Sequence, residues 1–470
     1  MHEQRGVWNC SRGHVKRSWH AGLALCLALC GVACGSSRDE RPPAPGNVMS
    51  NPDCPVPDGP CDIRRADCQS AVLALTACVR GDADVPLPPL RVITPAQFRD
   101  ELTNQVSATG SDTLADAALV ALHLLPAGMT STAAAVDAQA QGVVAFYDDE
   151  NKGVTIIDGG QLGDQLEAMY ELSHELTHYL QDQTVGIAEL TKLFPRTNDG
   201  VTAARNLIEG EAVVNSTRAL AMIMQRAVNR LPWGQLFENL DLTLLSNVNA
   251  ASARLQTAAL ILPYAVGTRY VGQVWNGYDR AHVDDLFAQA PRAVVDWLAG
   301  YGQDMPAPTL VEALDCGPPE APSGYVLEVL DSFGPTGALA LLAAAEPASD
   351  LTLTAALRGD AIAVYDKPET GDSSVLVAWR LRFDSAGSAR EFASIIGSLG
   401  FSSRVFGSEV VLSATGDPAH NPLTGSQFDA CPKLDQLHPR MAADSGRAAL
   451  RRGLPHHLAF GAIDALRRMH

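Results

Sequence analysis

The sequence predicts an α+β protein: a mainly helical middle with a small β-hairpin, followed by a C-terminal α+β unit. Apolar residues recur at helical spacing through most of residues 162–278. Two short apolar runs flank a polar turn over residues 143–158, which indicates a hairpin. Apolar and polar residues alternate over residues 375–384, as in a strand that buries one face.

The composition and charge are those of a globular protein. The chain has 470 residues, of which 46% are hydrophobic and 19% are charged, and this length allows two or three domains. Lys and Arg number 35 against 53 Asp and Glu, so the formal net charge is −18. A protein this acidic repels phosphate backbones, and nucleic acid is therefore not expected as a partner.

Residues 1–33 have the pattern of a secretory signal. Four basic residues precede the apolar run at 21–33, which is too short to span a bilayer of roughly 30 Å as a helix. The sequence GVAC that ends at Cys34 is similar to the lipobox of bacterial lipoproteins, although Gly31 stands where that motif usually has Leu. The resemblance implies lipidation of Cys34 and a lipid anchor in the bacterial cell envelope. An ordinary cleaved signal, the alternative, gives a secreted protein.

Six cysteines remain after the signal and Cys34, and an even number in an exported chain predicts disulfides. Four of them lie within 25 residues without a nearby histidine, so residues 34–85 are expected to form a Pro-rich tether and a small disulfide module. A zinc cluster or free thiols are the alternatives, and the four allow three pairings. The last two are expected to pair by elimination. The six are Cys54, Cys61, Cys68, Cys78, Cys316 and Cys431.

The helical domain is expected over residues 86–312. Its first helix should begin after Thr94, because Pro95 suits the first turn and Gln97 completes a capping box. Longer helices follow from the apolar spacing, with Pro263 as a kink or a start in the last of them. Their expected ranges are 162–183, 201–231 and 250–278.

The C-terminal α+β unit is expected over residues 313–432. Strands are predicted at 361–366 and 375–384, then a helix capped by Ser388, then a pair of strands near 403–413. Residues 433–470 carry seven basic and three acidic side chains without clear periodicity, so a basic, mobile tail is expected there.

The sequence HELTH at residues 174–178 carries the strongest chemical signal. On a helix, positions i and i+4 share one face about 5–6 Å apart, so His174 and His178 can bind one metal ion. Glu175 projects about 100° away around the same turn and can reach a metal-bound water without being a ligand. An exposed helix with inert polar residues is the alternative, and the apolar character of this helix argues against it.

A catalytic zinc also needs a third protein ligand and an open position for water. Glu209 and Glu211 lie on the next predicted helix, but two positions differ by roughly 200° around a helix, so only one of them can face the metal. Gly210 between them costs about 1 kcal/mol within a helix, which suggests that another helix approaches closely there.

HELTH followed by 30 residues and then EGEA resembles the gluzincin pattern, in which zinc peptidases carry HExxH on one helix and a glutamate ligand on the next. Together with the similarity to exported bacterial metallopeptidase-like proteins described below, the resemblance covers about residues 86–310. It implies a zincin-like domain, one Zn²⁺ per chain and Glu209 as the third ligand. Glu211 then falls at a variable position and is a candidate to orient a histidine, as is Asp182, four residues after His178.

The stretch PYAVG at residues 263–267 resembles the P-Y-x-x-G of gluzincin aminopeptidases, whose tyrosine stabilises the oxyanion. That residue maps to Tyr264. A core tyrosine with a satisfied hydroxyl is the alternative, and Arg269 and His282 are other candidate donors. The runs HELTHYLQDQ, IEGEA, PYAVG and VDDLFAQAP are also similar to uncharacterised exported bacterial metallopeptidase-like proteins.

The function predicted from the sequence is that of an exported zinc peptidase acting on a peptide or protein substrate, with Glu175 as general base. The alternative is a catalytically silent, peptidase-like surface lipoprotein that binds a partner or an envelope component. A third possibility, binding by the C-terminal unit, has no supporting aromatic cluster or charge run.

Overall fold

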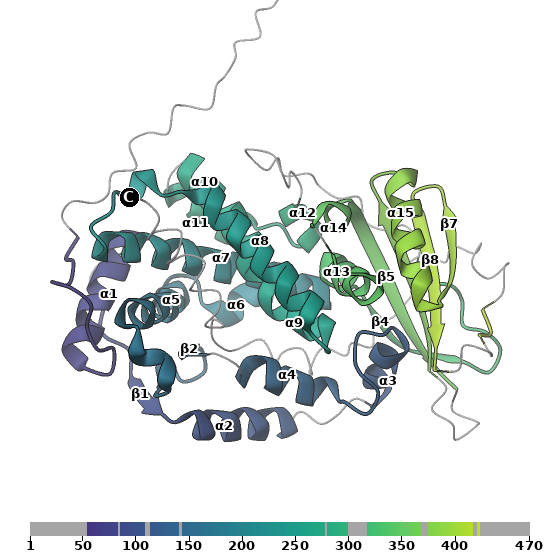
Figure 1. Cartoon of the computed structure of the whole chain (residues 1–470), viewed down its shortest axis with the longest axis horizontal. Coiled ribbons are helices and arrows are strands. Elements are labelled where there is room, and N and C mark those ends of the chain that lie inside the picture. The colour runs from purple at the N-terminus through teal and green to yellow at the C-terminus, as the bar shows by residue number, and fades with distance from the viewer. Residues whose placement is uncertain are drawn as a thin grey trace, which may run out of the picture. The chain divides into compact units, whose positions relative to one another are not determined.

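The computed structural model shows a mixed α+β architecture, which confirms the expected fold class (Figure 1). Cys34, Cys316, Cys431, the signal and the basic tail lie outside the described part of the chain. The structure describes residues 54–82, 85–108, 113–140, 143–277, 280–298, 317–348, 350–367, 375–416 and 421–423.

A three-stranded sheet with the strand order β1–β3–β2 belongs to the helical part of the chain. β1 (Leu90–Ile93) runs parallel to β3 (Gly153–Ile157), and β2 (Ala145–Asp148) runs antiparallel to β3. The hairpin expected over 143–158 is confirmed. β2 lies at the edge of this sheet, where α5 packs against it.

Two long helices, α5 (Gln165–Thr184) and α7 (Asn198–Ile223), pack against each other and place the candidate site. Their starts are capped by side chains, since Asp164 accepts from the first amides of α5 and Thr197 accepts from Gly200 N in α7. α5 agrees with the expected helix. α7 ends before the expected Leu231, because the chain turns at residues 224–227 into a short 3₁₀ turn.

The helix expected over 250–278 is interrupted at Pro263. Its first part is α9 (Arg254–Leu262), which passes into a π-helical turn, η3 (Pro263–Gly267), and then into α10 (Thr268–Gly277). Proline has no N–H to donate within a helix, and this break in the hydrogen bonding favours such a turn. Pro263 is therefore a kink. α8 (Trp233–Ala250), which precedes α9, was not expected from the sequence.

The remaining helices are short. α2 confirms the expected capping box, because Thr94 N donates to Gln97 Oε1 at 2.8 Å and Gln97 N donates to Thr94 Oγ1 at 3.2 Å. These helices are α2 (Pro95–Ala108), α3 (Thr113–Ala121), α4 (Ser131–Ala140), η1 (Gly160–Gly163), α6 (Ile187–Thr191), η2 (Val228–Arg230), α11 (Arg280–Gln289), α12 (Val294–Leu298) and α14 (Thr352–Ala355).

The cysteine-rich segment is more ordered than expected. Disulfides Cys54–Cys78 and Cys61–Cys68 confirm that these four cysteines pair with one another. However, the segment also contains α1 (Ala66–Arg80), which packs against α5 and α7 and shares a hydrophobic cluster with them. The sequence predicted a disulfide module here but not this buried helix, because the surrounding Pro, Asp and Gly outweighed the apolar spacing of residues 66–80.

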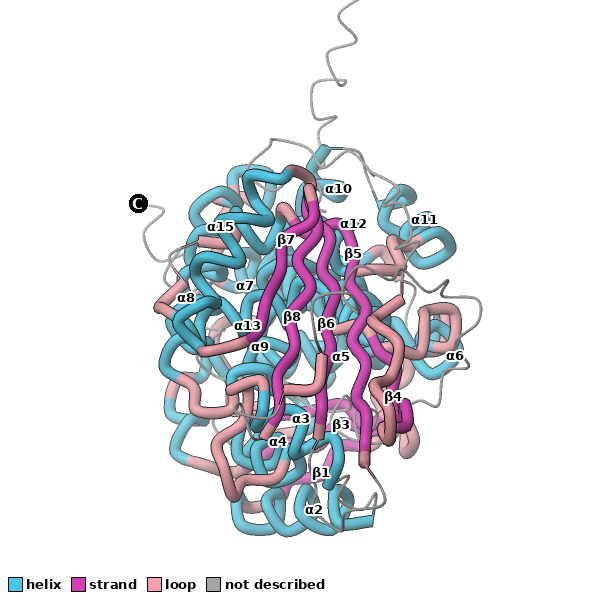
Figure 2. The backbone as a smooth tube through the Cα atoms, turned by 90° about the vertical axis from the view of Figure 1, so that its right-hand side faces the viewer, coloured by secondary structure: helices cyan, strands magenta, loops and turns pink. Residues whose placement is uncertain are grey.

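A five-stranded antiparallel sheet forms the C-terminal part, with the order β4–β5–β6–β8–β7 (Figure 2). α13 (Gly334–Ala345) and α15 (Ala386–Ile396) pack against it, and Ser385, not Ser388, caps α15. The strands are β4 (Val326–Asp331), β5 (Leu357–Asp366), β6 (Leu376–Phe383), β7 (Ser402–Phe406) and β8 (Glu409–Thr415). β5 to β8 confirm the expected strands, whereas β4 was not predicted. β6 is buried on both faces and not on one as the alternation suggested, because Ala378 and Arg380 are buried as well.

One hydrophobic cluster joins the helical part to the C-terminal sheet. It contains Val214 of α7, Leu262 of α9, Leu341 of α13, Ile362 of β5 and Trp379 of β6. The expected boundary between the two parts, at 312/313, lies outside the described residues, so the division into domains remains a prediction. Among the described helices, none has the length and apolar character needed to cross a membrane.

Candidate metal centre

α5 carries the two histidines within the interior of the protein. The helix lies between α1, α7 and β2, and every residue from Glu167 to Asp182 is buried. His174 and His178 point their Nε2 atoms to the same place, 3.0 Å apart, and their rings meet edge to face with centroids 4.7 Å apart. The i and i+4 spacing thus has the geometry that the sequence predicted.

α7 brings Glu209 to this histidine pair. Its Oε2 lies 3.2 Å from His174 Nε2 and 3.3 Å from His178 Nε2, so three ligand atoms form a nearly regular triangle. A tetrahedral ion that binds nitrogen and oxygen at about 2.0–2.1 Å holds its ligands roughly 3.3 Å from one another. The triangle therefore fits one face of such a site. Among the described residues, these three are the group whose donor atoms converge closely enough to hold a metal ion.

The protonation of the three groups is also compatible with a metal site. Burial lowers the pKa of His174 to about 4. Burial also lowers the pKa of His178, but the Glu209 carboxylate outweighs this and raises it to about 9. Burial raises the pKa of Glu209, and the charge of His178 with hydrogen bonds from both histidines overcomes this and holds it well below its usual range. With Glu209 ionised, His178 protonated and His174 neutral, the three groups hold one proton, on His178, which a metal cation would displace.

Glu209, and not Glu211, closes the site because of how α7 is rotated. Gly210 faces Gly267 of η3 so closely that a Cβ atom on Gly210 would lie 2.4 Å from the Gly267 carbonyl carbon. The close helix approach suggested by Gly210 is confirmed. This contact fixes the rotation of α7, with Glu209 on the side of the histidines and Glu211 turned toward Gln181 and Arg80.

Glu175 lies next to the histidines on α5 and is completely buried. Its Oε2 accepts a hydrogen bond of 2.8 Å from the backbone N–H of Tyr147 on the edge strand β2. This backbone donor orients the carboxylate, because β2 is held in register by β3. The sequence named Glu175 but could not show that this strand positions it.

Tyr264 of η3 also lies at the site, next to His174 and Glu209. Its ring lies 5.9 Å from the ring of His174 and is almost fully buried. Burial and the Glu209 carboxylate raise the pKa of Tyr264 well above its usual range, so its hydroxyl keeps its proton. The structure therefore brings Tyr264 to the candidate site. Arg269 instead pairs with Asp241, and the side chain of His282 lies outside the described part.

Gln181, which sequence reasoning missed, contacts the second nitrogen of His178. Its Oε1 lies 2.9 Å from His178 Nδ1, and its Nε2 donates to Glu211 Oε2 at 3.0 Å. Glu211 in turn accepts from Arg80 Nε at 3.0 Å. Gln181 therefore orients His178, and Glu211 in turn orients Gln181. The position of Gln181, three residues after His178 on the same helix, was the signal available in the sequence.

Asp182, the other candidate for orienting His178, has different partners. It accepts from the Tyr147 hydroxyl at 2.7 Å, from Lys152 Nζ at 2.5 Å and from Ile187 N at 2.9 Å. These contacts connect the end of α5 to β2 and to the turn before β3. The structure thus places Asp182 where it steadies the edge strand that holds Glu175.

Comparisons with protein-family models, with curated proteins and with solved structures give no match for this chain.

Proposed function

We propose that this protein is an exported zinc-dependent peptidase of the gluzincin type. The observation that carries the proposal is the buried triangle of His174, His178 and Glu209, whose edges of 3.0–3.3 Å suit a tetrahedral ion. Two imidazole nitrogens and one carboxylate oxygen are the donor set of many hydrolytic zinc sites, which leave a fourth position open. Bound zinc would supply Lewis acidity and a lower pKa for its water.

The chain's own residues have separate roles in this mechanism. Glu175, with Oε2 held by Tyr147 N–H, takes a proton from the attacking water and gives it to the leaving amine nitrogen. Tyr264, whose hydroxyl stays protonated, donates a hydrogen bond to the oxyanion. Gln181 accepts from His178 Nδ1–H and thereby leaves Nε2 unprotonated toward the metal. The buried surroundings exclude bulk water from these groups.

Zinc content and peptide hydrolysis test this proposal on the chain from Gly35 onward. We expect one zinc per chain in the wild type and in Glu175→Gln, because Glu175 is not a ligand. Hydrolysis of casein or a peptide library should fall by a factor of about 10²–10⁴ in Glu175→Gln, the usual contribution of general base catalysis. Glu189→Gln, exposed on α6, is the matched control and should keep full activity.

Two results would oppose the proposal in different ways. Zinc retained in Glu209→Ala and lost in Glu211→Ala would show that the ligand set is wrong. One zinc per chain without cleavage of any peptide by the wild type would leave the catalytically silent surface lipoprotein as the better description.

We also propose that the mature chain is lipid-anchored at Cys34 in the bacterial cell envelope. The two disulfides support export, because such bonds persist in oxidising compartments. The lipobox-like sequence before Cys34 supports the anchor. Labelled fatty acid should enter the wild type and not Cys34→Ser, and equal labelling of the two would refute the anchor.

A further inference from the structure

Arg80, the last residue of α1, carries a positive charge inside the protein. Its side chain is 1% exposed, and the carboxylate that faces it, Glu211 of α7, is fully enclosed. α1 is fixed at this end, because the disulfide between Cys54 and Cys78 joins its last turn to the start of the cysteine-rich segment, residues 54–82. A buried charge lowers stability unless it is paired and hydrogen-bonded, so the contacts of Arg80 show what holds it there.

The guanidinium group of Arg80 holds both oxygens of Glu211. Nε donates to Oε1 at 3.0 Å, and Nη2 donates to Oε2 at 3.4 Å. Nη1 donates to Asp82 Oδ2 at 2.5 Å, and Nη2 also donates to Thr184 Oγ1 at 3.4 Å. A planar guanidinium group that contacts both oxygens fixes the position and direction of a carboxylate more closely than a single donor does. Arg80 therefore sets where the oxygens of Glu211 lie.

The direction of the hydrogen bonds carries this position to His178. Gln181 Nε2 has two N–H groups, which donate to Glu211 Oε2 at 3.0 Å and to the Ile208 carbonyl at 2.9 Å. Both partners are acceptors, so the amide nitrogen stays on their side and Oε1 faces His178 Nδ1 at 2.9 Å. Oε1 can only accept, so Nδ1 carries the proton and the neutral ring keeps the lone pair of Nε2 for the metal site.

We propose that Arg80 is a positioning residue of the metal centre, which acts through Glu211 and Gln181 to hold the ring of His178. The inference rests on the metal ligands of the proposed function and extends that centre to the cysteine-rich segment. The contacts of Arg80 within the described part of the chain reach neither histidine, so it is neither a ligand nor a catalytic residue. Its removal should therefore change how tightly the metal is bound.

Zinc affinity, measured by chelator competition on the chain from Gly35 onward, tests this role without requiring turnover. Arg80→Met keeps much of the side-chain length but removes every donor. Its zinc affinity should fall about 10–100-fold, the usual loss when a residue that orients a metal ligand is replaced. Arg65→Met is the matched control, because Arg65 lies just before the same helix and pairs with Asp67 on the surface, where both side chains are 67% exposed. This control should bind zinc as the wild type does.

A second variant keeps the test valid if Arg80→Met fails to fold. Removing Arg80 alone leaves the charge of Glu211 buried without its partner, which is strongly destabilising. The double variant Arg80→Met with Glu211→Leu replaces the whole pair by apolar side chains, a change that usually leaves stability unchanged or raises it. It also removes the acceptor of Gln181 Nε2, so zinc affinity should fall as in Arg80→Met while the midpoint of urea unfolding does not fall.

An NMR signal of the zinc-loaded protein separates positioning from a general effect on folding. The Nδ1 proton of His178 lies between the ring and Gln181 Oε1, inside the protein, and should exchange slowly with water in the wild type. Its exchange should be faster in Arg80→Met and in the double variant, and unchanged in Arg65→Met. Arg80→Lys keeps the charge and one donor, so it should recover part of the zinc affinity and slow the exchange again. Wild-type zinc affinity and unchanged exchange in folded Arg80→Met or in the folded double variant would overturn the proposal.

Failure of this proposal can be distinguished from failure of the proposed function. Zinc binding that weakens in Arg80→Met and not in Arg65→Met, in a protein that cleaves no peptide, supports the role of Arg80 and refutes the peptidase. Peptide cleavage by a protein whose zinc affinity is the same in the wild type and in Arg80→Met supports the peptidase and refutes the role of Arg80. A wild-type chain that binds no zinc refutes both.

Discussion

Substituting Gly210 by alanine tests the contact that orients α7. The added Cβ would lie 2.4 Å from the carbonyl carbon and 2.5 Å from the carbonyl oxygen of Gly267, whereas ordinary contacts begin at 3.4 Å. Both neighbours are backbone atoms, so no side-chain rotation can relieve the overlap. α7 and η3 must therefore move apart by about 1 Å, or the backbone must deform locally.

The expected magnitude follows from two opposing effects. Overpacking of a well-packed interior costs about 1–3 kcal/mol, and the upper end applies here because backbone must move. Alanine in place of glycine within a helix recovers about 1 kcal/mol. The net loss of unfolding free energy should be about 2 kcal/mol. If the peptidase proposal is correct, a 1 Å displacement of Tyr264 on η3 should also lower kcat about 10²-fold.

Urea unfolding monitored by circular dichroism measures the stability change as a shift of the midpoint. Gly234→Ala, in the first turn of α8, is the matched control, because a Cβ there meets no atom within 4 Å. It should be as stable as the wild type or slightly more stable. Equal midpoints for Gly210→Ala and Gly234→Ala would refute the account of how α7 is oriented.

Three further predictions concern the metal, a disulfide and a buried carboxylate. The apparent zinc affinity should rise about tenfold per pH unit from pH 5 to 8, because zinc must displace the proton of His178. Burial lowers the pKa of His178, but the Glu209 carboxylate outweighs this and raises it to about 9. A zinc affinity that does not change with pH in a chelator competition would contradict this prediction. Replacing Cys54 and Cys78 with serine should lower the free energy of unfolding by about 3 kcal/mol, because the disulfide closes a loop across 24 residues. Replacing Cys61 and Cys68, which are 7 residues apart, should cost about 1 kcal/mol less. Urea unfolding measures both losses, and the reverse order would contradict the prediction. Burial, with the nearby Asp360, raises the pKa of Asp199 well above its usual range. The contribution of Asp199 to the free energy of unfolding is therefore full below about pH 4 and is lost as the pH rises through the raised pKa. The stability of Asp199→Asn relative to the wild type should therefore increase between pH 5 and 8, and a constant difference would contradict this.

Features that depend on a few neighbouring residues were predictable from the sequence. The convergence of His174 and His178 follows from helix geometry alone, and the capping box of Thr94 and Gln97 follows from local hydrogen bonding. The strands β5 to β8 were also recognisable from their short apolar runs, whereas β4 was not predicted. α1 was missed because a composition rich in Pro, Asp and Gly around it outweighed its short apolar pattern.

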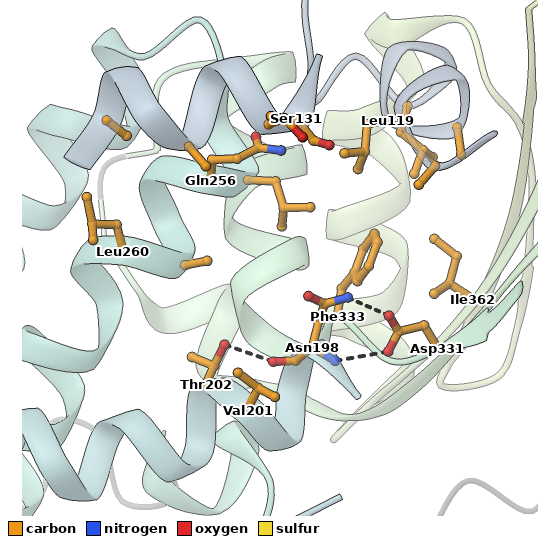
Figure 3. A pocket seen from close by; sticks show the side chains of 18 of the residues that line it. Leu119, Ser131, Asn198, Val201, Thr202, Gln256, Leu260, Asp331, Phe333 and Ile362 are labelled. Atoms are coloured by element: carbon orange, nitrogen blue, oxygen red, sulfur yellow. Dashed lines mark hydrogen bonds between the residues drawn. The ribbon is translucent and has the colours of Figure 1, made fainter. Parts of the chain in front are cut away.

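Features that depend on contacts between distant segments could not be predicted from the sequence. Residues 181 and 80 are far apart in the chain, yet Gln181, Glu211 and Arg80 form the line of contacts behind His178. A cavity between the helical part and the C-terminal sheet is lined by α3, α4, α7, α9, β4 and β5 (Figure 3), and no local sequence pattern predicts that these elements meet.

The sequence by itself determined the chemistry that is available, namely two histidines on one helix face and a carboxylate on a following helix. The tertiary structure decided which carboxylate completes the site. Helix period places Glu209 and Glu211 in different directions around α7 but does not say which of them meets His174 and His178. The close contact between Gly210 and Gly267 settles that rotation, because only two glycines allow the backbones of α7 and η3 to approach so closely.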